Sequence, residues 1–322
     1  MARGDDTADA RKAVDASLAE LATSAGRVGD GAVAPEAEPE QQIHANFAQA
    51  HVYLALAAKL NGDLKLAQTI ALREAPFHRT GVFAQSESAV TYLINTAKLE
   101  QALGNLDAAL ALANEAVAVS QVAERDSEVE QLGTRALQAT ILEDAGKLVE
   151  AARVYEESRQ AWLRIGGENH PKVITALNNL GLNAARQGDF ARGIELLEEA
   201  CRRSIITHGE RHQHTLDNHG NLALAYDGAG RLDDAVALIE RLLPVIQAER
   251  GSPSIDECDW LYFLAQLRAK QGRNDEALAL LTRVCQQGEG LVGAEVTVRE
   301  AQKMKARLAR VIDSTLPAVN NR

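Results

Sequence analysis

Apolar side chains recur at helical spacing on both sides of evenly spaced glycines. Around Gly188, Leu177 and Leu180 lie on one stripe before the glycine, and Ile194 and Leu197 lie on another stripe after it. Apolar residues three or four positions apart share one face of an α-helix. A glycine between two such stripes can end the first helix in a left-handed conformation without a Cβ penalty. The pattern therefore predicts two antiparallel helices joined by a short turn.

This helix–turn–helix pattern repeats along the chain with a fixed period. The turn glycines are spaced by 42 residues: Gly62, Gly104, Gly146, Gly188, Gly230 and Gly272. A small residue follows each glycine by five positions: Ala67, Ala109, Ala151, Gly193, Ala235 and Ala277. The small residue allows the two helices of a pair to approach closely, and neighbouring pairs must cover the apolar face that one pair leaves exposed. We therefore predict an all-α solenoid of six helix pairs.

The two ends of the chain differ from the repeats. Residues 1–41 predict a short helix and then a flexible linker, because the second half of this segment is rich in glycine, proline and acidic residues. The six repeats occupy 42–291. Residues 292–313 show an amphipathic pattern and predict a helix that caps the last apolar face. We expect the tail, 314–322, to fray.

Two segments carry a more specific signature. The sequences "TALNNLGLNAARQGDFARGIELLEEA" at 175–200 and "LDNHGNLALAYDGAGRLDDAVALIERL" at 216–242 resemble the tetratricopeptide repeat. The 42-residue spacing and the "GENHP" linker at 167–171 are similar to the kinesin-light-chain type of this repeat. The resemblance extends over roughly 43–290. It implies a right-handed α–α superhelix in which the first helix of each pair lines a concave groove.

An asparagine recurs at one position of the groove that the resemblance implies. It is Asn95, Asn179 and Asn221 in repeats two, four and five. An amide both donates and accepts hydrogen bonds, so it can hold the backbone of an extended peptide whatever the peptide sequence. In related proteins such asparagines bind the ligand backbone, and the resemblance implies the same role here. The alternative is that each asparagine only caps a helix or bonds locally.

Other side chains of the same register class are candidates to flank the ligand: Tyr53, Lys98, Asn178, Arg186, Tyr262, Gln266 and Lys270. The cations Lys98, Arg186 and Lys270, if they face the groove, would bind acidic side chains or a terminal carboxylate. The alternative is that they lie on a solvated face. The family's carboxylate clamp of Lys, Asn and Arg is not reproduced, since Asp217 and Leu224 occupy positions where cations would be needed.

The charge balance narrows the classes of partner. The chain has 322 residues, with 34 Lys and Arg against 45 Asp and Glu, for a net charge of −11. An acidic chain repels the phosphates of nucleic acids and anionic membrane surfaces. No run of about 18 apolar residues is present and no apolar segment follows the N-terminus, which predicts neither a membrane span nor a secretory signal. The three cysteines form no CxxC pair, as expected for reduced thiols in a cytoplasmic protein.

A cluster of histidines suggests a metal site but fits a linker better. His208 and His212 have the i, i+4 spacing that would suit a metal ion on a helix. Gly209, however, places the segment in a turn, and His212 aligns with His170, which lies in another linker. No cysteine or carboxylate set completes the ligand shell. We therefore expect no metal.

No catalytic site is predicted. The GxSxG motif, the Walker A loop and the dinucleotide fingerprint are absent from the sequence. Cys201 and Cys285 share one register late in the second helix, where buried packing is the default, and Cys258 lies near a helix start with no base placed by spacing. We therefore expect neither an enzyme nor a cofactor.

Together these patterns predict an adaptor or scaffold that binds a partner peptide or protein segment in the concave groove. The alternative is a regulatory or sensor module, in which the superhelix responds to a peptide or an effector protein. We expect a cytoplasmic protein with a protein or peptide partner, and neither nucleic acid nor a membrane as partner. The sequence leaves homo-oligomerisation open.

Overall fold

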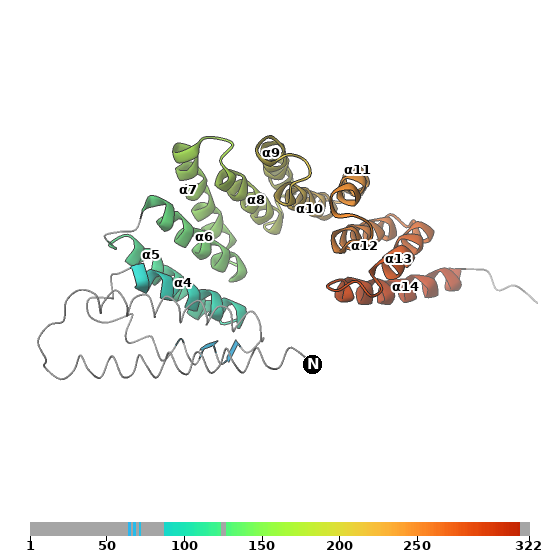
Figure 1. Cartoon of the computed structure of the whole chain (residues 1–322), viewed down its shortest axis with the longest axis horizontal. Coiled ribbons are helices and arrows are strands. Elements are labelled where there is room, and N and C mark those ends of the chain that lie inside the picture. Colours follow the sequence, from blue (N-terminus) through green and yellow to red (C-terminus); the bar gives the residue numbers. More distant parts are fainter. Residues whose placement is uncertain (1–63, 66, 69–70, 72–86, 124–126, 316–322) are drawn as a thin grey trace, which may run out of the picture. The chain divides into compact units, whose positions relative to one another are not determined.

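The protein folds as a series of α-helices. The computed structural model describes residues 64–65, 67–68, 71, 87–123 and 127–315. No strand occurs in this part of the chain, so the all-α prediction is confirmed (Figure 1). Tyr53 and the predicted segment 1–41 lie outside the described residues. The helices are α4 (Glu87–Ala102), α5 (Leu106–Ser120), α6 (Glu128–Asp144), α7 (Leu148–Gly166), α8 (Pro171–Arg186), α9 (Phe190–His208), α10 (Gln213–Gly228), α11 (Leu232–Arg250), α12 (Ile255–Lys270), α13 (Asn274–Gly288) and α14 (Glu295–Thr315).

The turns within the helix pairs adopt the conformation that the sequence predicts. The turn glycines of the five described pairs all have a positive φ: Gly104 (80°), Gly146 (73°), Gly188 (86°), Gly230 (74°) and Gly272 (75°). At the end of α8 the Gly188 N–H donates to Ala185 O and the Asp189 N–H donates to Ala184 O, both at 3.0 Å. These two bonds form a Schellman motif, which satisfies the last carbonyls of the helix. The glycine is therefore needed for its backbone conformation.

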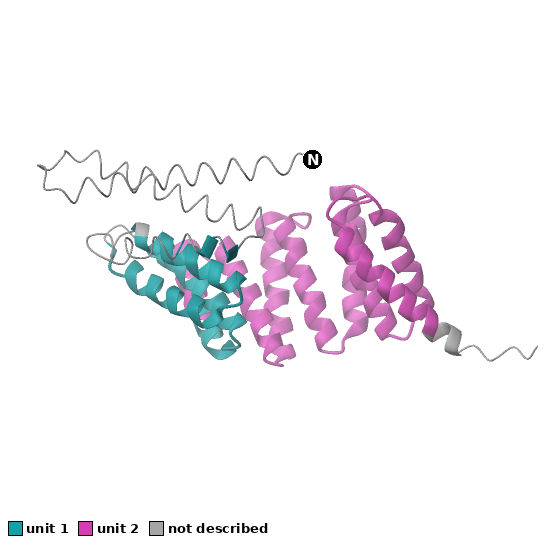
Figure 2. Cartoon of the chain, turned by 90° about the horizontal axis from the view of Figure 1, so that it is seen from below, with its two compact units in different colours: residues 1–154 teal, residues 155–322 magenta. Residues whose placement is uncertain are grey.

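The helices group into two compact units, Met1–Val154 and Tyr155–Arg322 (Figure 2). In the first unit α5 packs between α4 and α6, and the small residues Ala97 and Ala109 are fully buried where α4 and α5 lie together. A capping box in which Ser127 and Glu130 bond each other's backbone N–H begins α6. This unit therefore contains the second predicted repeat and the first helix of the third.

The second unit stacks each helix on the next one from α8 to α14, and α8 also contacts α10. The closest approach is between α8 and α9, where two glycines face each other. A Cβ added to Gly193 would lie 2.9 Å from the backbone O of Gly181, and one added to Gly181 would lie 2.6 Å from Leu197 Cγ. At the same positions of α12 and α13 the residues are Ala265 and Ala277, both fully buried. The predicted role of the small residues in close helix packing is thus visible in the structure.

The last helix covers the apolar side of the final pair. Helix α14 packs on α13 and α12. Its Ala301 and Leu308 join the core cluster that also contains Leu261 and Leu281. Burying these side chains removes from water the face that the last pair would otherwise expose, which is the function of a capping element in a repeat array.

Candidate functional site

A row of amide side chains lies on the first helices of the second unit. Asn221 on α10 donates from Nδ2 to Asn178 Oδ1 on α8 at 2.9 Å, and Asn178 Nδ2 donates to Asn179 Oδ1 at 3.5 Å. All three side chains are half-buried. Within the described residues, Asn179 Nδ2 and Asn221 Oδ1 make no hydrogen bond. The row therefore keeps one amide donor and one amide acceptor for another molecule.

A pocket of about 420 Å³ lies beside this row, between α10 and α12. It is lined by Leu216, Asp217, Gly220, Asn221, Leu224, Asp259, Trp260 and Phe263. The indole of Trp260 lies against the α10 backbone, because a Cβ added to Gly220 would be only 3.7 Å from Trp260 Cζ2. Leu224 is 52% exposed, which is unusual for a leucine within a helix stack. The pocket thus offers aromatic and aliphatic surface next to the amide row.

The charge around the pocket is negative. Asp217 and Asp259 contribute one carboxylate from each helix, and no Lys, Arg or His is among the lining residues. Asp217 Oδ1 accepts from Gln213 Nε2 at 2.8 Å, and Asp259 Oδ1 accepts from the Thr297 hydroxyl. A carboxylate can accept about four hydrogen bonds, so both groups retain the capacity to bind a cationic side chain.

The cations predicted to face the groove do not join this site. Lys270 Nζ lies 2.6 Å and 2.7 Å from the two carboxylate oxygens of Asp227 on α10, which forms an ion pair within the protein. Arg186 is exposed at the end of α8, and Lys98 is exposed on α4 of the first unit. The structure therefore places none of the three among the residues that line the pocket.

The other predicted groove residues are divided among three places. Asn95 is half-buried on α4, in the first unit, whereas Tyr262 and Gln266 are half-buried on α12. Tyr53 is outside the described residues. Of the ten predicted site residues, the structure joins by hydrogen bonds the three that form the amide row, Asn178, Asn179 and Asn221.

The aromatic and aliphatic part of the site is missing from the sequence predictions. Trp260, Phe263 and Leu224 are not among the predicted site residues. The 42-residue alignment did hold a signal for one of them, because Phe263 occupies the position of Asn179 and Asn221. The fourth and fifth repeats have asparagine at this position, so a phenylalanine in the sixth changes the surface that α12 presents there.

The histidines serve the linkers, as the sequence predicts. His212 Nδ1 accepts from the His214 N–H at 3.2 Å and caps α10, and His170 caps α8 by the same bond to the Lys172 N–H. The ring of His208 stacks on that of His212, with 4.7 Å between centroids. Burial, and then the neighbouring histidines, lower the pKa of His208. Among the described residues, no group of three His, Cys, Asp or Glu side chains has the geometry of a metal site.

Two of the three cysteine thiols are buried in the helix packing. Cys201 and Cys258 are buried, and Cys285 is half-buried. Burial raises the pKa of the Cys201 thiol to about 12 and also raises that of Cys258. Since the thiolate is the reactive form, both side chains are neutral and unreactive at pH 7.

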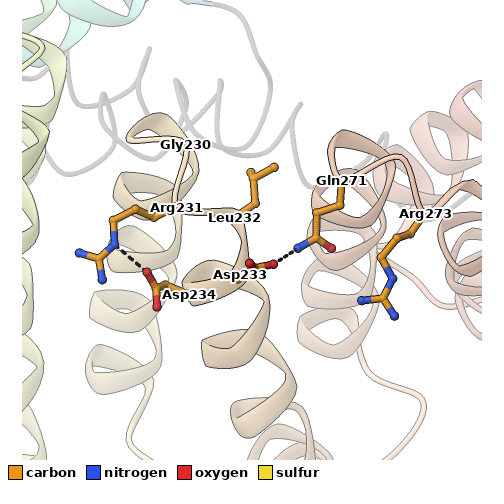
Figure 3. A pocket seen from close by; sticks show the side chains of 7 residues that line it. All are labelled: Gly230, Arg231, Leu232, Asp233, Asp234, Gln271 and Arg273. Carbon is orange, nitrogen blue, oxygen red and sulfur yellow. Dashed lines mark hydrogen bonds and ion pairs between the residues drawn. The ribbon is translucent and has the colours of Figure 1, made fainter.

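A second pocket, of about 520 Å³, lies at the turn ends of α10 and α12 (Figure 3). Its charges are already paired: Arg231 Nε lies 2.6 Å from Asp234 Oδ2, and Gln271 Nε2 donates to Asp233 Oδ1 at 2.7 Å (Figure 3). Its remaining cation, Arg273, pairs with Glu276. Only the bond between Gln271 and Asp233 joins neighbouring turns, whereas the two ion pairs each lie within one turn. The charged groups that line this pocket are therefore already engaged within the protein. Separately, none of the helices in the described ranges combines the length and hydrophobicity that crossing a bilayer requires.

Comparison with known proteins places the repeats in a family. A model of the tetratricopeptide repeat matches residues 133–205 and 213–287. Protein KINESIN LIGHT CHAIN-RELATED 2 of Arabidopsis thaliana is 27% identical over 200 residues, which are 61% of this chain and 30% of that protein. Protein KINESIN LIGHT CHAIN-RELATED 3 of the same plant is 31% identical over 129 residues, which are 39% of this chain and 20% of that protein. The chain thus spans less than a third of the curated relatives it matches.

The solved structures show the same fold. BtubC (BKLC) from P. vanneervenii superposes with a TM-score of 0.55 at 20% identity, over 81% of this chain and 96% of that one. The predicted tetratricopeptide-like solenoid is therefore confirmed. The repeat family and its kinesin-light-chain relatives also support the predicted role as a protein–protein interaction scaffold. Residues 133–205 and 213–287 thus carry tetratricopeptide repeats, and the chain is similar to kinesin light chain-related proteins.

Proposed function

We propose that the protein is a scaffold that binds an extended segment of a partner protein across helices α8, α10 and α12. The amide row carries this proposal, because Asn179 Nδ2 and Asn221 Oδ1 have no partner among the described residues. An extended segment offers an N–H and a C=O at every residue. One amide donor and one amide acceptor can therefore bind the segment's backbone without regard to its side chains.

The size of the expected interactions fits reversible binding. A hydrogen bond between amides contributes about 0.5–1.5 kcal/mol net, so the amide row alone binds weakly. Burial of one leucine-sized ligand side chain in the adjacent pocket adds about 1.5–3 kcal/mol. The amide row then positions the segment, and the pocket beside Trp260 supplies most of the affinity.

The proposed role needs no chemical step. The tetratricopeptide and kinesin-light-chain families are typically non-enzymatic scaffolds, and we extend that property to this chain. The cytoplasmic location, the lack of a cofactor and the exclusion of nucleic acid and membrane partners stay predictions from sequence. Homo-oligomerisation is likewise a prediction that the sequence leaves open.

Selection from a random dodecapeptide library followed by affinity measurement tests the proposal. Peptides enriched on the full chain are measured by fluorescence anisotropy against wild type and an Asn178→Ala/Asn179→Ala/Asn221→Ala variant. We expect the variant to lose about tenfold in affinity or more, since it removes the amide atoms that would hold the peptide backbone. N-methylation of one peptide amide at a time locates the backbone N–H that Asn221 Oδ1 accepts.

A matched control replaces three amides that are exposed elsewhere in the second unit, as Asn169→Ala/Gln286→Ala/Gln302→Ala. This control should bind like wild type. The proposal is wrong if no peptide is enriched, or if the enriched peptides bind the amide-row variant as tightly as they bind wild type.

A further inference from the structure

We infer that the pocket between α10 and α12 selects a segment in which a lysine or arginine stands beside a bulky apolar residue. The inference rests on the proposed function, since it names the class of segment that the same face takes. Three features of the pocket carry it: an apolar wall, a carboxylate on each side, and the absence of cations from its lining.

The apolar wall is rigid and accessible. Trp260 packs behind on the core cluster of Leu216, Leu242 and Ile246, so its ring is held in place. Leu224 exposes half of its surface toward solvent. Because Gly220 has no side chain, the Trp260 ring approaches its backbone, and Cζ2 lies 3.7 Å from the position that a Cβ would occupy. A leucine, methionine or phenylalanine of a ligand would gain contact with all of these surfaces.

The carboxylates provide the selective element. Asp217 comes from α10 and Asp259 from α12, so a cationic side chain laid between the helices meets one on each side. The side chain of Asp217 is 54% exposed, and Asp259 is also exposed, so neither group is sealed from a ligand. A guanidinium or ammonium group can pair with either carboxylate while its apolar stem covers the aromatic ring.

An acidic segment is disfavoured by the same charges. Lys270, the cation on α12 that could have bound a ligand carboxylate, is held by both oxygens of Asp227. Asp227 is only 15% exposed, so freeing Lys270 would leave a half-hidden carboxylate without its partner. With a net charge of −11, the whole chain also repels an acidic partner.

The test uses the full chain and three fluorescein-labelled dodecapeptides that differ only at three central positions, in an otherwise Gly-Ser sequence. The centres are Lys-Leu-Lys, Glu-Leu-Glu and Lys-Ser-Lys. We expect Lys-Leu-Lys to bind at least about tenfold tighter than either of the others, because only it fills the apolar wall and matches both carboxylates. Raising the salt concentration from 50 to 500 mM should weaken Lys-Leu-Lys and leave the uncharged selected peptides unchanged.

Two variants locate the charge effect. Asp217→Asn/Asp259→Asn should weaken Lys-Leu-Lys about 3- to 30-fold, the range for two exposed ion pairs. Asp275→Asn/Glu289→Gln changes the net charge equally at two exposed sites outside the pocket, and it should leave the affinity within about twofold. In a Trp162→Phe background Trp260 is the sole tryptophan, so its emission should change when Lys-Leu-Lys saturates the protein.

The outcomes separate this inference from the proposed function. The inference is overturned if Glu-Leu-Glu binds tighter than Lys-Leu-Lys. It is also overturned if Asp217→Asn/Asp259→Asn and Asp275→Asn/Glu289→Gln lose affinity for Lys-Leu-Lys equally. In either case the amide row can still bind peptides. A change of oligomeric state in Asp217→Asn/Asp259→Asn, with no change in peptide affinity, would identify a second copy of the chain as the occupant and also overturns it. Failure of every peptide, including those from the random library, overturns the proposed function itself.

Discussion

The two ends of the proposed ligand-binding face use the same repeat positions for different chemistry. On α8 two successive groove positions are Asn178 and Asn179, whereas on α12 the same positions are Tyr262 and Phe263. The α8 end therefore offers amide atoms, and the α12 end offers aromatic surface. Helix α10 lies between them and contributes Asn221 to the amide row and Leu224 to the pocket.

This difference shows how a repeat array can separate affinity from selectivity. The turn glycines and small packing residues recur in every repeat of the sequence, where they suit a tight turn and close packing of the two helices of a pair. The outward positions of the first helices carry no such restriction. A backbone-binding row at one end and a side-chain-binding pocket at the other can then read one extended segment over neighbouring repeats.

The largest expected effect concerns the close packing of α8 on α9. Gly193→Ala should lower the free energy of unfolding by about 1–3 kcal/mol, because its Cβ would lie 2.9 Å from the backbone O of Gly181 and 3.2 Å from Ala185 N. A backbone atom cannot move aside as a side chain can. Urea unfolding followed by circular dichroism measures the change. A variant as stable as wild type would show that the α8–α9 spacing relaxes freely.

The second prediction concerns α10, which serves both ends. His219 on α10 is 2% exposed, and its Nδ1 lies 2.7 Å from Thr215 O. Burial lowers the pKa of His219, and the bond to Thr215 opposes this only in part. The unfolded chain therefore binds the proton more readily, so stability is complete above the unfolded pKa of about 6.5 and falls as the pH drops below it.

His219 alone cannot change the free energy of unfolding by more than about 1.4 kcal/mol per pH unit. Urea unfolding of wild type and His219→Gln between pH 7.5 and 5 measures it, and the variant should show the shallower dependence. His214→Gln removes an exposed histidine of the same helix and is the control. Equal slopes for wild type and His219→Gln would contradict the prediction.

A third prediction distinguishes the ends by their selectivity. Asn178→Ala removes the acceptor for Asn221 Nδ2 and should weaken binding by about 1 kcal/mol, or about fivefold. Because the amide row is proposed to hold the backbone, Lys-Leu-Lys and an uncharged selected peptide should lose affinity to the same extent. Anisotropy titrations of both peptides provide the measurement. A loss confined to one peptide would show that the α8 end also reads side chains.

Much of the fold and part of the site follow from the repeat period. The period places Gly188 and the other turn glycines, and it aligns Asn179 with Asn221. These features depend only on the repeat register, whereas the bond from Asn221 to Asn178 joins two different registers, 43 positions apart. The ion pair of Lys270 with Asp227 joins residues 43 positions apart and involves two different registers. A one-dimensional pattern cannot show that pairing, because it depends on which way each side chain turns.

The pocket could not be predicted for the same reason. It exists because the Trp260 ring lies over a glycine of the preceding repeat, at a position where the fourth repeat has Asn178. A glycine inside a helix pattern indicates close approach or a weak helix, and the sequence alone does not separate the two. The structure shows a close approach, since the Trp260 indole is the group that lies within 4 Å of the Gly220 Cβ position.

The smallest expected effect is a gain in stability, opposite in sign to the loss expected for Gly193→Ala. Gly220→Ala adds a Cβ that would lie 3.7 Å from Trp260 Cζ2, an ordinary van der Waals distance. In a helix interior, alanine is more stable than glycine by about 0.5–1 kcal/mol, so the melting temperature should rise by about 1–4 °C. Since the methyl group occupies little of the pocket, Lys-Leu-Lys should bind nearly as before. The larger Gly220→Leu should instead block the pocket while the amide row stays intact. If Gly220→Ala destabilised the chain as Gly193→Ala does, the two ends would be packed equally tightly and the pocket would not be open space.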